Sequence, residues 1–104
     1  MANEKLIIST AGSKEEASTI AHSLVEGQLA ACVNITGPVE SVYRWQGRVE
    51  SATEFTMLVK TTSAKSKAVM QRIRELHSYD LPEVIQIDIQ DGSPEYLKWI
   101  AESV

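Results

Sequence analysis

The segment of residues 39–61 constrains the fold most, because it contains two extended runs that meet at Gln46-Gly47-Arg48. Apolar or aromatic residues occupy odd positions in both runs: Val39, Tyr43 and Trp45 before the turn, and Val49, Phe55, Met57 and Val59 after it. A period of two is typical of β-strands, so the segment is predicted to form a β-hairpin. A two-residue loop would divide these side chains between the two faces. We therefore expect a three-residue loop, with Trp45 opposite Val49 and Gly47 at a positive φ.

The second run of this hairpin, residues 49–61, is long for a small protein. It would extend for about 40 Å at roughly 3.3 Å per residue. A domain of this size is only about 35 Å across, since its radius of gyration is about 13 Å. One end of the hairpin must then project beyond the core, and that end carries Tyr43 and Trp45. Soluble proteins usually bury exposed rings and open strand edges against a partner, so we expect a homo-oligomer built through this hairpin.

The chain before the hairpin shows the pattern of a strand followed by a helix. Residues 6–11 form a short apolar run that is typical of an inner strand. Ser13 stands three residues before Glu16, which is a capping-box spacing, and Gly27 supplies a C-terminal stop. The helix between them is expected to bury one stripe of side chains, namely Ala17, Ile20, Ala21, Leu24 and Val25.

Two further runs are predicted to be strands. Residues 29–35 are apolar except for Asn34 and are expected to form a buried strand, after which Gly37-Pro38 bends the backbone without ending the extended path. In residues 84–89, Val84 is followed by isoleucines that alternate with polar side chains. This pattern predicts a last strand with one buried face, made of Ile85, Ile87 and Ile89.

Two more helices complete the predicted elements. Ser63 is expected to cap a helix. One face of this helix carries Val69, Met70, Ile73, Leu76 and His77. After a connection at residues 78–82, Ser93 and Pro94 begin a closing helix that presents Leu97, Ile100, Ala101 and Val104 at helical spacing. The order of elements is that of an α+β, ferredoxin-like split βαβ fold with an antiparallel sheet and an extra C-terminal helix. No repeat or linker is found, so residues 1–104 are expected to form one domain.

Charge and cysteine content limit the classes of partner. The chain has 14 acidic and 10 basic side chains and a formal charge of −4. Nucleic acids and anionic membranes favour basic surfaces, so neither is expected as the main partner. The single cysteine, Cys32, cannot form an intrachain disulfide, and no long apolar segment follows Met1. A cytoplasmic protein without a signal segment or membrane span is therefore expected.

The sequence carries no recognisable catalytic motif. Residues 11–14 after the first strand lack the pattern of a phosphate-binding loop, and no HExxH or CxxC spacing occurs. The cysteine and the two histidines have no evident third group with which to form a nucleophilic site. The chain is therefore not expected to be an enzyme.

Several segments resemble the CutA divalent-cation tolerance proteins, in order and spacing along nearly the whole chain. They are Ala30-Ala31-Cys32-Val33-Asn34-Ile35, Ser41-Val42-Tyr43-Arg44-Trp45-Gln46-Gly47, Leu58-Val59-Lys60-Thr61-Thr62, His77-Ser78-Tyr79-Asp80-Leu81-Pro82-Glu83 and Ser93-Pro94-Glu95-Tyr96-Leu97-Lys98-Trp99. The resemblance implies a ferredoxin-like fold that assembles as a tight homotrimer through interlocking hairpins, similar in architecture to the PII signalling proteins. It also implies a role in tolerance to copper and other divalent cations.

The resemblance further implies where copper would bind. In the family, copper binding is attributed to a cysteine at the end of the first strand and to two adjacent histidines before the Pro-Glu segment. On this chain those positions read Ser9 and Leu76-His77, so two of the three ligands are absent. Because a cuprous ion prefers thiolate, thioether and imidazole, weak binding of copper or another divalent cation at His77 is expected. His77 could equally cap helix carbonyls, and Cys32 is typical of a small core residue.

One further site is expected at a cleft between subunits of such a trimer. It would gather amphipathic and ionisable side chains of the hairpin and of the loop before the last strand, namely Tyr43, Trp45, Lys60, His77, Tyr79 and Glu83. Cys32 is the further residue expected at this cleft or interface. The alternative is that the rings only hold the trimer together. Three functional classes therefore remain: a metal-binding trimer, a PII-like regulatory module that binds a small ligand in the cleft, and a structural scaffold.

Overall fold

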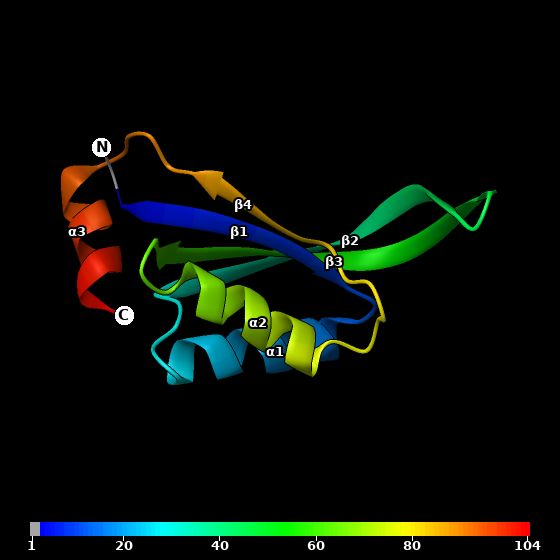
Figure 1. Ribbon diagram of the computed structural model, residues 1–104, viewed down its shortest axis with the longest axis horizontal. Helices are drawn as coiled ribbons and strands as arrows, with labels where there is room; N and C mark the ends of the chain where they lie inside the picture. Colours follow the sequence, from blue (N-terminus) through cyan, green and yellow to red (C-terminus); the bar gives the residue numbers. More distant parts are fainter. Residues whose placement is uncertain (1–2) are drawn as a thin grey trace.

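The computed structural model describes residues 3–104, which form one antiparallel sheet and three helices. The elements in chain order are β1 (Glu4–Ala11), α1 (Lys14–Glu26), β2 (Cys32–Trp45), β3 (Arg48–Thr62), α2 (Ser66–Leu76), β4 (Val84–Asp88) and α3 (Pro94–Glu102). The strand order is β2-β3-β1-β4. Helices α1 and α2 lie on the same side of the sheet, and α3 lies at the end away from the hairpin tip (Figure 1). The predicted ferredoxin-like fold is therefore confirmed.

The expectation of no signal segment was based on the first residues of the chain. Of these, Met1 and Ala2 lie outside the described residues. Within residues 3–104, no helix has both the length and the apolar character needed to cross a membrane.

The core lies between the sheet and the two helices. Ile7 of β1 and its partner Val59 of β3 face the helices and are fully buried. They pack with the predicted stripe of α1 and with α2, whose buried residues include Ala17, Ile20, Leu24, Val69 and Ile73. Val25 was predicted to belong to this stripe but is 42% exposed, because its position lies too far round the helix to reach the sheet.

The helix ends follow local hydrogen bonds. The Ser13 hydroxyl accepts a bond of 3.1 Å from the Glu16 N–H, and Gly27 follows the last residue of α1, so both predicted ends are confirmed. Ser63, by contrast, does not cap α2. The helix begins at Ser66, whose hydroxyl donates to the Ser63 carbonyl at 3.1 Å.

The strand before the hairpin starts later than the apolar run predicts. The N–H groups of Leu29 and Ala30 both donate to the Leu24 carbonyl at the end of α1, so this part of the chain forms a turn rather than a strand. Strand β2 begins at Cys32 and continues to Trp45 through Gly37-Pro38, as expected for a bend that does not end the extended path.

The hairpin loop has two residues, not the predicted three. Trp45 pairs with Arg48, so the loop consists of Gln46 and Gly47, with φ of 51° and 79°. Two positive φ values are typical of a tight type I′ turn. The prediction was wrong because it assumed one register along the whole hairpin. The register instead shifts at Gly37 and Pro38. At this point two residues of β2 lie opposite only one residue of β3, which is a β-bulge.

The shift in β2 turns the outer part of the hairpin to the other face of the sheet. Before the shift, Ile35 lies opposite Met57, a buried residue on the helix side. After it, Val39 lies opposite Glu54, and Tyr43 lies opposite a residue on the same face of β3 as Glu54. Tyr43 and Trp45 therefore face the side of the sheet that α1 and α2 do not cover.

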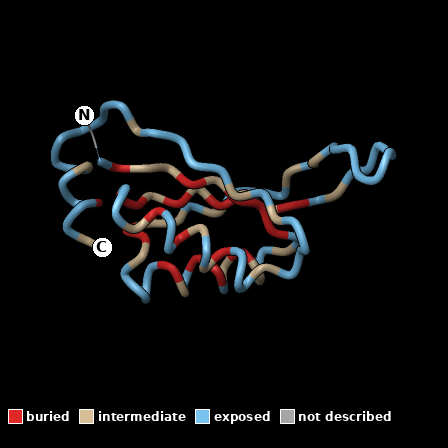
Figure 2. Tube along the Cα trace, in the orientation of Figure 1, coloured by how far each residue is buried: buried red, intermediate tan, exposed pale blue. Residues whose placement is uncertain are grey.

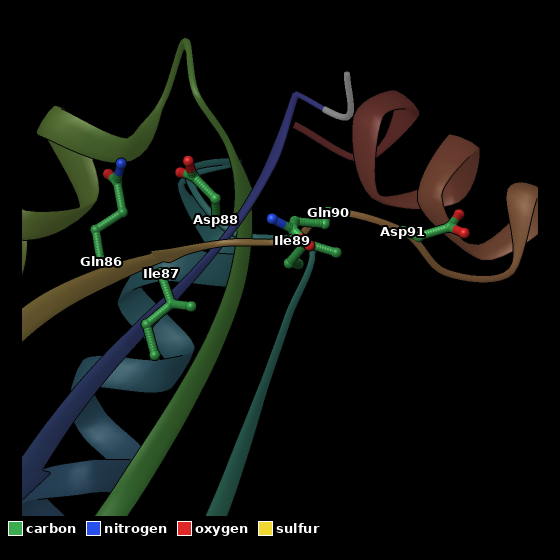
Figure 3. A pocket seen from close by; sticks show the side chains of 6 residues that line it. All are labelled: Gln86, Ile87, Asp88, Ile89, Gln90 and Asp91. Atoms are coloured by element: carbon green, nitrogen blue, oxygen red, sulfur yellow. The ribbon is translucent and has the colours of Figure 1, made fainter.

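The uncovered face of the sheet is apolar along β1 and β4. Ile85 lies opposite Ile8, and Ile87 lies opposite Leu6. The two β4 isoleucines are 48% and 45% exposed, so the prediction of a buried isoleucine face is wrong for this chain alone. The helices cover the other face, where Val84 packs against the core. Ile87 points to the opposite side of β4 from Gln86 and Asp88 (Figure 3).

The hairpin projects beyond the rest of the molecule, as its length predicts. The molecule measures 44 × 25 × 22 Å, and the ends of β2 and β3 extend past the helices with an exposed tip (Figures 1 and 2).

Two buried hydroxyls on the sheet allow a matched test of hydrogen bonding. The Ser9 hydroxyl has no hydrogen-bond partner among residues 3–104, whereas the Thr61 hydroxyl donates to the Leu29 carbonyl at 2.6 Å. A buried polar group without a partner destabilises the folded state. Ser9→Ala is therefore expected to raise the free energy of unfolding by about 1 kcal/mol, and Thr61→Val to lower it by about 1 kcal/mol. Urea unfolding at a fixed protein concentration measures both. Equal destabilisation by the two substitutions would contradict this difference.

Candidate functional site

A groove with a volume of about 640 Å³ lies between the hairpin and the loop that joins α2 to β4. The hairpin contributes Tyr43, Trp45 and Glu54, and the loop contributes Tyr79, Leu81 and Glu83. The groove lies on the uncovered side of the sheet, because the shift in β2 turns the two hairpin rings that way. Three rings and two carboxyl groups therefore border one space within a single chain.

The loop is attached to the hairpin through a buried carboxylate. The Tyr79 hydroxyl donates a hydrogen bond of 2.9 Å to Glu54 Oε2, and Glu54 is only 7% exposed. Burial, and then this hydrogen bond and the charge of Glu54, raise the pKa of Tyr79 to about 12. The phenol therefore remains a donor far above neutral pH and holds the loop against β3.

His77 fixes the same loop from behind the groove. Its side chain is fully buried and its ring lies 4.7 Å from the Tyr79 ring. With the ring proton on Nε2, His77 donates to the Thr10 carbonyl at 2.6 Å, and Nδ1 accepts from the Tyr79 N–H at 3.1 Å. Both ring nitrogens thus have partners, and the histidine orients Tyr79 without lining the groove.

Glu16 holds the start of the loop from α1. One carboxylate oxygen accepts from the Ser78 N–H at 2.7 Å and the other from the Ser78 hydroxyl at 3.1 Å. Burial acts to raise the pKa of Glu16, but the two hydrogen bonds from Ser78 and the nearby His77 outweigh it and lower that pKa. The interaction therefore favours the ionised carboxylate in the folded state.

The lowered pKa of Glu16 predicts a dependence of stability on pH. A depressed folded-state pKa contributes stability above the unfolded value of 4.5, and this contribution is lost as the pH falls through the folded-state pKa. Glu16→Gln is therefore expected to lower the free energy of unfolding at pH 7 and to cost less at pH 3. Urea unfolding at both pH values measures this, with the exposed neighbour Glu15→Gln as control. A cost of Glu16→Gln that is the same at both pH values would contradict the prediction.

The other residues expected at a cleft lie elsewhere. Lys60 of β3 pairs with Cys32 of β2. Lys60 is six residues along β3 from Glu54 of the groove, so the two residues are about 20 Å apart. Cys32 is partly buried and lies beside Tyr96 of α3. Burial is the main cause that raises the pKa of Tyr96, and the neighbouring Cys32 thiol adds to it. The structure thus brings Tyr43 and three other predicted residues together, namely Trp45, Tyr79 and Glu83.

Glu54 is the ionisable residue of the groove that was not predicted from the sequence. It stands directly before the strongly apolar run of β3, and a charged side chain at the edge of such a run is the signal that could have identified it. Its partner, Tyr79, lies 25 residues away in the chain, so no short spacing reveals the pair.

The positions implied as copper ligands do not form a three-ligand centre. Ser9 lies on the helix side of the sheet opposite Met57, Leu76 has no donor atom and is exposed, and both nitrogens of His77 are in use. More generally, no three His, Cys, Asp or Glu side chains among residues 3–104 gather in an arrangement that could hold a metal ion.

Comparison with known proteins identifies the family. The family model described as "CutA1 divalent ion tolerance protein" matches residues 5–103. The "Divalent-cation tolerance protein CutA" of Thermus thermophilus is 44% identical over 100 residues, covering 96% of this chain and 97% of that protein. The protein with the same name from Archaeoglobus fulgidus is 48% identical over 95 residues, covering 91% and 92%.

A solved structure agrees with these sequence matches. The crystal structure of CutA from Xylella fastidiosa superposes with a TM-score of 0.96 at 39% identity, covering 98% of each chain. The predicted resemblance is confirmed, and this chain belongs to the CutA1 divalent ion tolerance protein family.

Proposed function

We propose that this chain acts in divalent-cation tolerance as a homotrimer that binds copper or another divalent cation weakly and catalyses no reaction. The family name supports the role in tolerance and describes no catalytic activity. The observation that carries the assembly is the uncovered apolar face of the sheet. A face of this kind is usually buried against another protein surface.

The two edges of the sheet support an assembly that closes on itself. β2 and β4 are the edge strands of the sheet formed by residues 3–104, and each has one row of backbone groups without a partner strand in that part of the chain. A shallow depression runs along residues 86–91 at the β4 edge (Figure 3). Pairing the β2 edge of one chain with the β4 edge of the next is a head-to-tail contact, which forms a ring when the rotation closes. If the uncovered faces of the sheets point toward the inside of such a ring, sister chains would cover Ile85 and Ile87.

Weak cation binding is consistent with the surroundings of His77. His77 Nδ1 and Glu16 Oε2 are 3.8 Å apart, so a cation between them would have an imidazole and a carboxylate as ligands. The same nitrogen already accepts the Tyr79 N–H, and Glu16 already accepts two bonds from Ser78. A cation must compete with these hydrogen bonds, and this competition lowers its affinity.

Calorimetric titration with Cu(II) and Zn(II) tests the metal part of the proposal. The chain has two histidines, so His22→Ala serves as a matched control for His77→Ala. His22 is exposed on α1 beside Glu26, away from the loop. We expect saturable binding by the wild type and by His22→Ala, and its loss in His77→Ala. Absence of binding by the wild type, or loss in His22→Ala alone, would overturn a cation site at His77.

The groove favours a second candidate function, that of a PII-like regulatory module. Its rings and carboxyl groups converge on a space of about 640 Å³, which is within the usual range for small-molecule sites. In this candidate, a small ligand in the groove alters a protein partner of the trimer. A thermal-shift screen of small molecules tests it, because a ligand selective for the folded state raises the melting temperature.

A further inference from the structure

We propose that the chain carries a site of spontaneous covalent modification at Asp91-Gly92, where the aspartate converts to isoaspartate. These two residues lie in the loop between β4, which ends at Asp88, and α3, which begins at Pro94. The reaction joins atoms of two neighbouring residues of one chain. It therefore requires neither a ligand nor a partner protein, and it is independent of the proposed function.

The modification consists of a cyclisation followed by a hydrolysis. The backbone nitrogen of Gly92 attacks the carboxyl carbon Cγ of Asp91, an N–Cγ bond forms, and the N–H hydrogen and the carboxyl OH leave as water. Water then opens the resulting succinimide ring. Opening at the former main-chain carbonyl leaves the chain running through Cβ and Cγ, which is isoaspartate. The water released in the first step is consumed in the second, so no other reactant is needed.

Asp91 is the aspartate at which this attack meets least hindrance. The chain has three aspartates, and the residues that follow them are Leu81, Ile89 and Gly92. A side chain on the following residue shields its backbone nitrogen, and branched side chains such as those of leucine and isoleucine do so strongly. Glycine has no side chain and reaches backbone angles that other residues avoid, so ring closure is easiest at Asp91.

The structure holds the two reacting groups close together. The Gly92 N–H donates a hydrogen bond to Asp91 Oδ1, with 2.8 Å between nitrogen and oxygen. The carboxyl carbon is bonded to this oxygen, so the nitrogen lies near the atom that it attacks. Groups that start close together lose less entropy on the way to the transition state.

The fold places few restraints on this part of the loop. Within residues 3–104, no hydrogen bond between backbone groups involves Asp91 or Gly92, whereas the N–H of the nearby Ile89 donates to the Glu4 carbonyl. Ring closure must rotate the backbone at the two reacting residues. Because this rotation breaks no backbone hydrogen bond, little local opening is needed.

The proposed trimer leaves the reaction possible. Figure 3 shows Asp91 next to α3, farther along the chain than Gln86 and Asp88 of the edge strand β4. The reaction needs water and rotation of the backbone, but no open surface. A sister chain packed tightly on the loop would restrict that rotation and slow the reaction, so the rate in the assembled protein is the quantity to measure.

Isoaspartate at residue 91 would alter how α3 is attached to the sheet. The conversion adds one backbone atom, Cβ, to the loop and leaves the free carboxylate at the former main-chain carbonyl. The next residue but one, Ser93, caps α3 by accepting a bond of 3.5 Å from the Tyr96 N–H. The modified linkage therefore lies directly before the start of the helix.

Peptide mapping of the folded protein, kept in neutral buffer below its melting temperature, tests the inference. Trypsin releases one peptide, residues 75–98, that contains Asp80, Asp88 and Asp91. Electron-transfer dissociation in a mass spectrometer distinguishes isoaspartate from aspartate at each position. We expect isoaspartate to accumulate at Asp91 at least tenfold faster than at Asp80 or Asp88. No isoaspartate at Asp91, or equal accumulation at Asp80, would overturn the inference.

Gly92→Ala tests the attacking nitrogen. The added Cβ would lie 3.5 Å from Leu97, which is an ordinary van der Waals contact, so the variant is expected to fold. It keeps Asp91 but shields the nitrogen, and accumulation of isoaspartate at Asp91 should fall at least tenfold. Asp91→Glu provides a second variant, since its ring would be one atom larger and should form much more slowly. Unchanged accumulation in Gly92→Ala would contradict attack by this nitrogen.

The same peptide from protein unfolded in guanidinium chloride shows what the fold contributes. Because the folded chain holds the Gly92 nitrogen beside the carboxyl group and leaves the loop backbone without hydrogen bonds, its rate is expected to lie within a few fold of the unfolded rate. A rate more than tenfold lower in the folded protein would show that the fold or a sister chain protects the site, and would overturn the inference.

Discussion

Replacing Ile87 with lysine is expected to convert the proposed trimer into monomers. Ile87 is 45% exposed in the single chain and lies on the uncovered face beside Leu6. If a sister chain covers this face, the substitution places an ammonium group in an apolar contact without a partner. Burying an unpaired charge costs several kcal/mol, which is enough to dissociate most interfaces. Light scattering coupled to gel filtration measures the resulting mass.

Val25 provides the matched control for Ile87. It is 42% exposed but lies on α1, on the helix side of the sheet, so Val25→Lys introduces the same charge at a similar exposure. The assembly of this variant is expected to remain trimeric. An unchanged mass in Ile87→Lys, or an equal loss of mass in both variants, would show that the uncovered face is not the contact.

Replacing Trp45 with alanine is expected to weaken the assembly by about 3 kcal/mol, or more than 100-fold in the dissociation constant. Trp45 precedes the two-residue loop, and it is 44% exposed in the single chain. Buried tryptophans at the centre of an interface commonly contribute this much, because truncation removes a large apolar surface. Sedimentation over a range of protein concentrations measures the dissociation.

Trp99 is the control for this second substitution. It carries the same ring at 45% exposure on α3, where it packs beside Tyr96. Trp99→Ala is expected to leave the dissociation constant within a few fold of the wild type. The hairpin would lie outside the contact if Trp45→Ala assembled as tightly as the wild type.

The parts of the fold that depend on local signals were predictable from the sequence. The ends of α1 follow from Ser13 and Gly27, because a cap and a stop act within a few residues of the chain. The projection of the hairpin follows from the length of an extended strand alone. Each of these features is fixed by residues that are close together in the sequence.

The register of the hairpin could not be predicted from alternation alone. A pattern of period two shows which residues share a face only while the register is constant. The extra residue at Gly37-Pro38 reverses the faces between Ile35 and Val39. The isoleucines of β4 show a related limit, because alternation shows that they share a face without showing what covers it.

The candidate site was predictable only in part, because its residues meet through the tertiary fold. The rings of Tyr43 and Trp45 are conspicuous in the sequence, and they do line the groove. The contact between Tyr79 and Glu54 joins residues that are 25 positions apart, and the one between His77 and Thr10 spans 67 positions. Spacing along the chain carries no signal for such pairs, so the contacts through which His77 orients the loop could not be predicted.

Sedimentation equilibrium of the purified protein at micromolar concentration tests the central claim most directly, namely that sister chains cover the projecting hairpin and the bare sheet face. A single species with about three times the 11.5 kDa mass of the chain is the predicted result. A species of 11.5 kDa at the same concentration would contradict the proposed assembly.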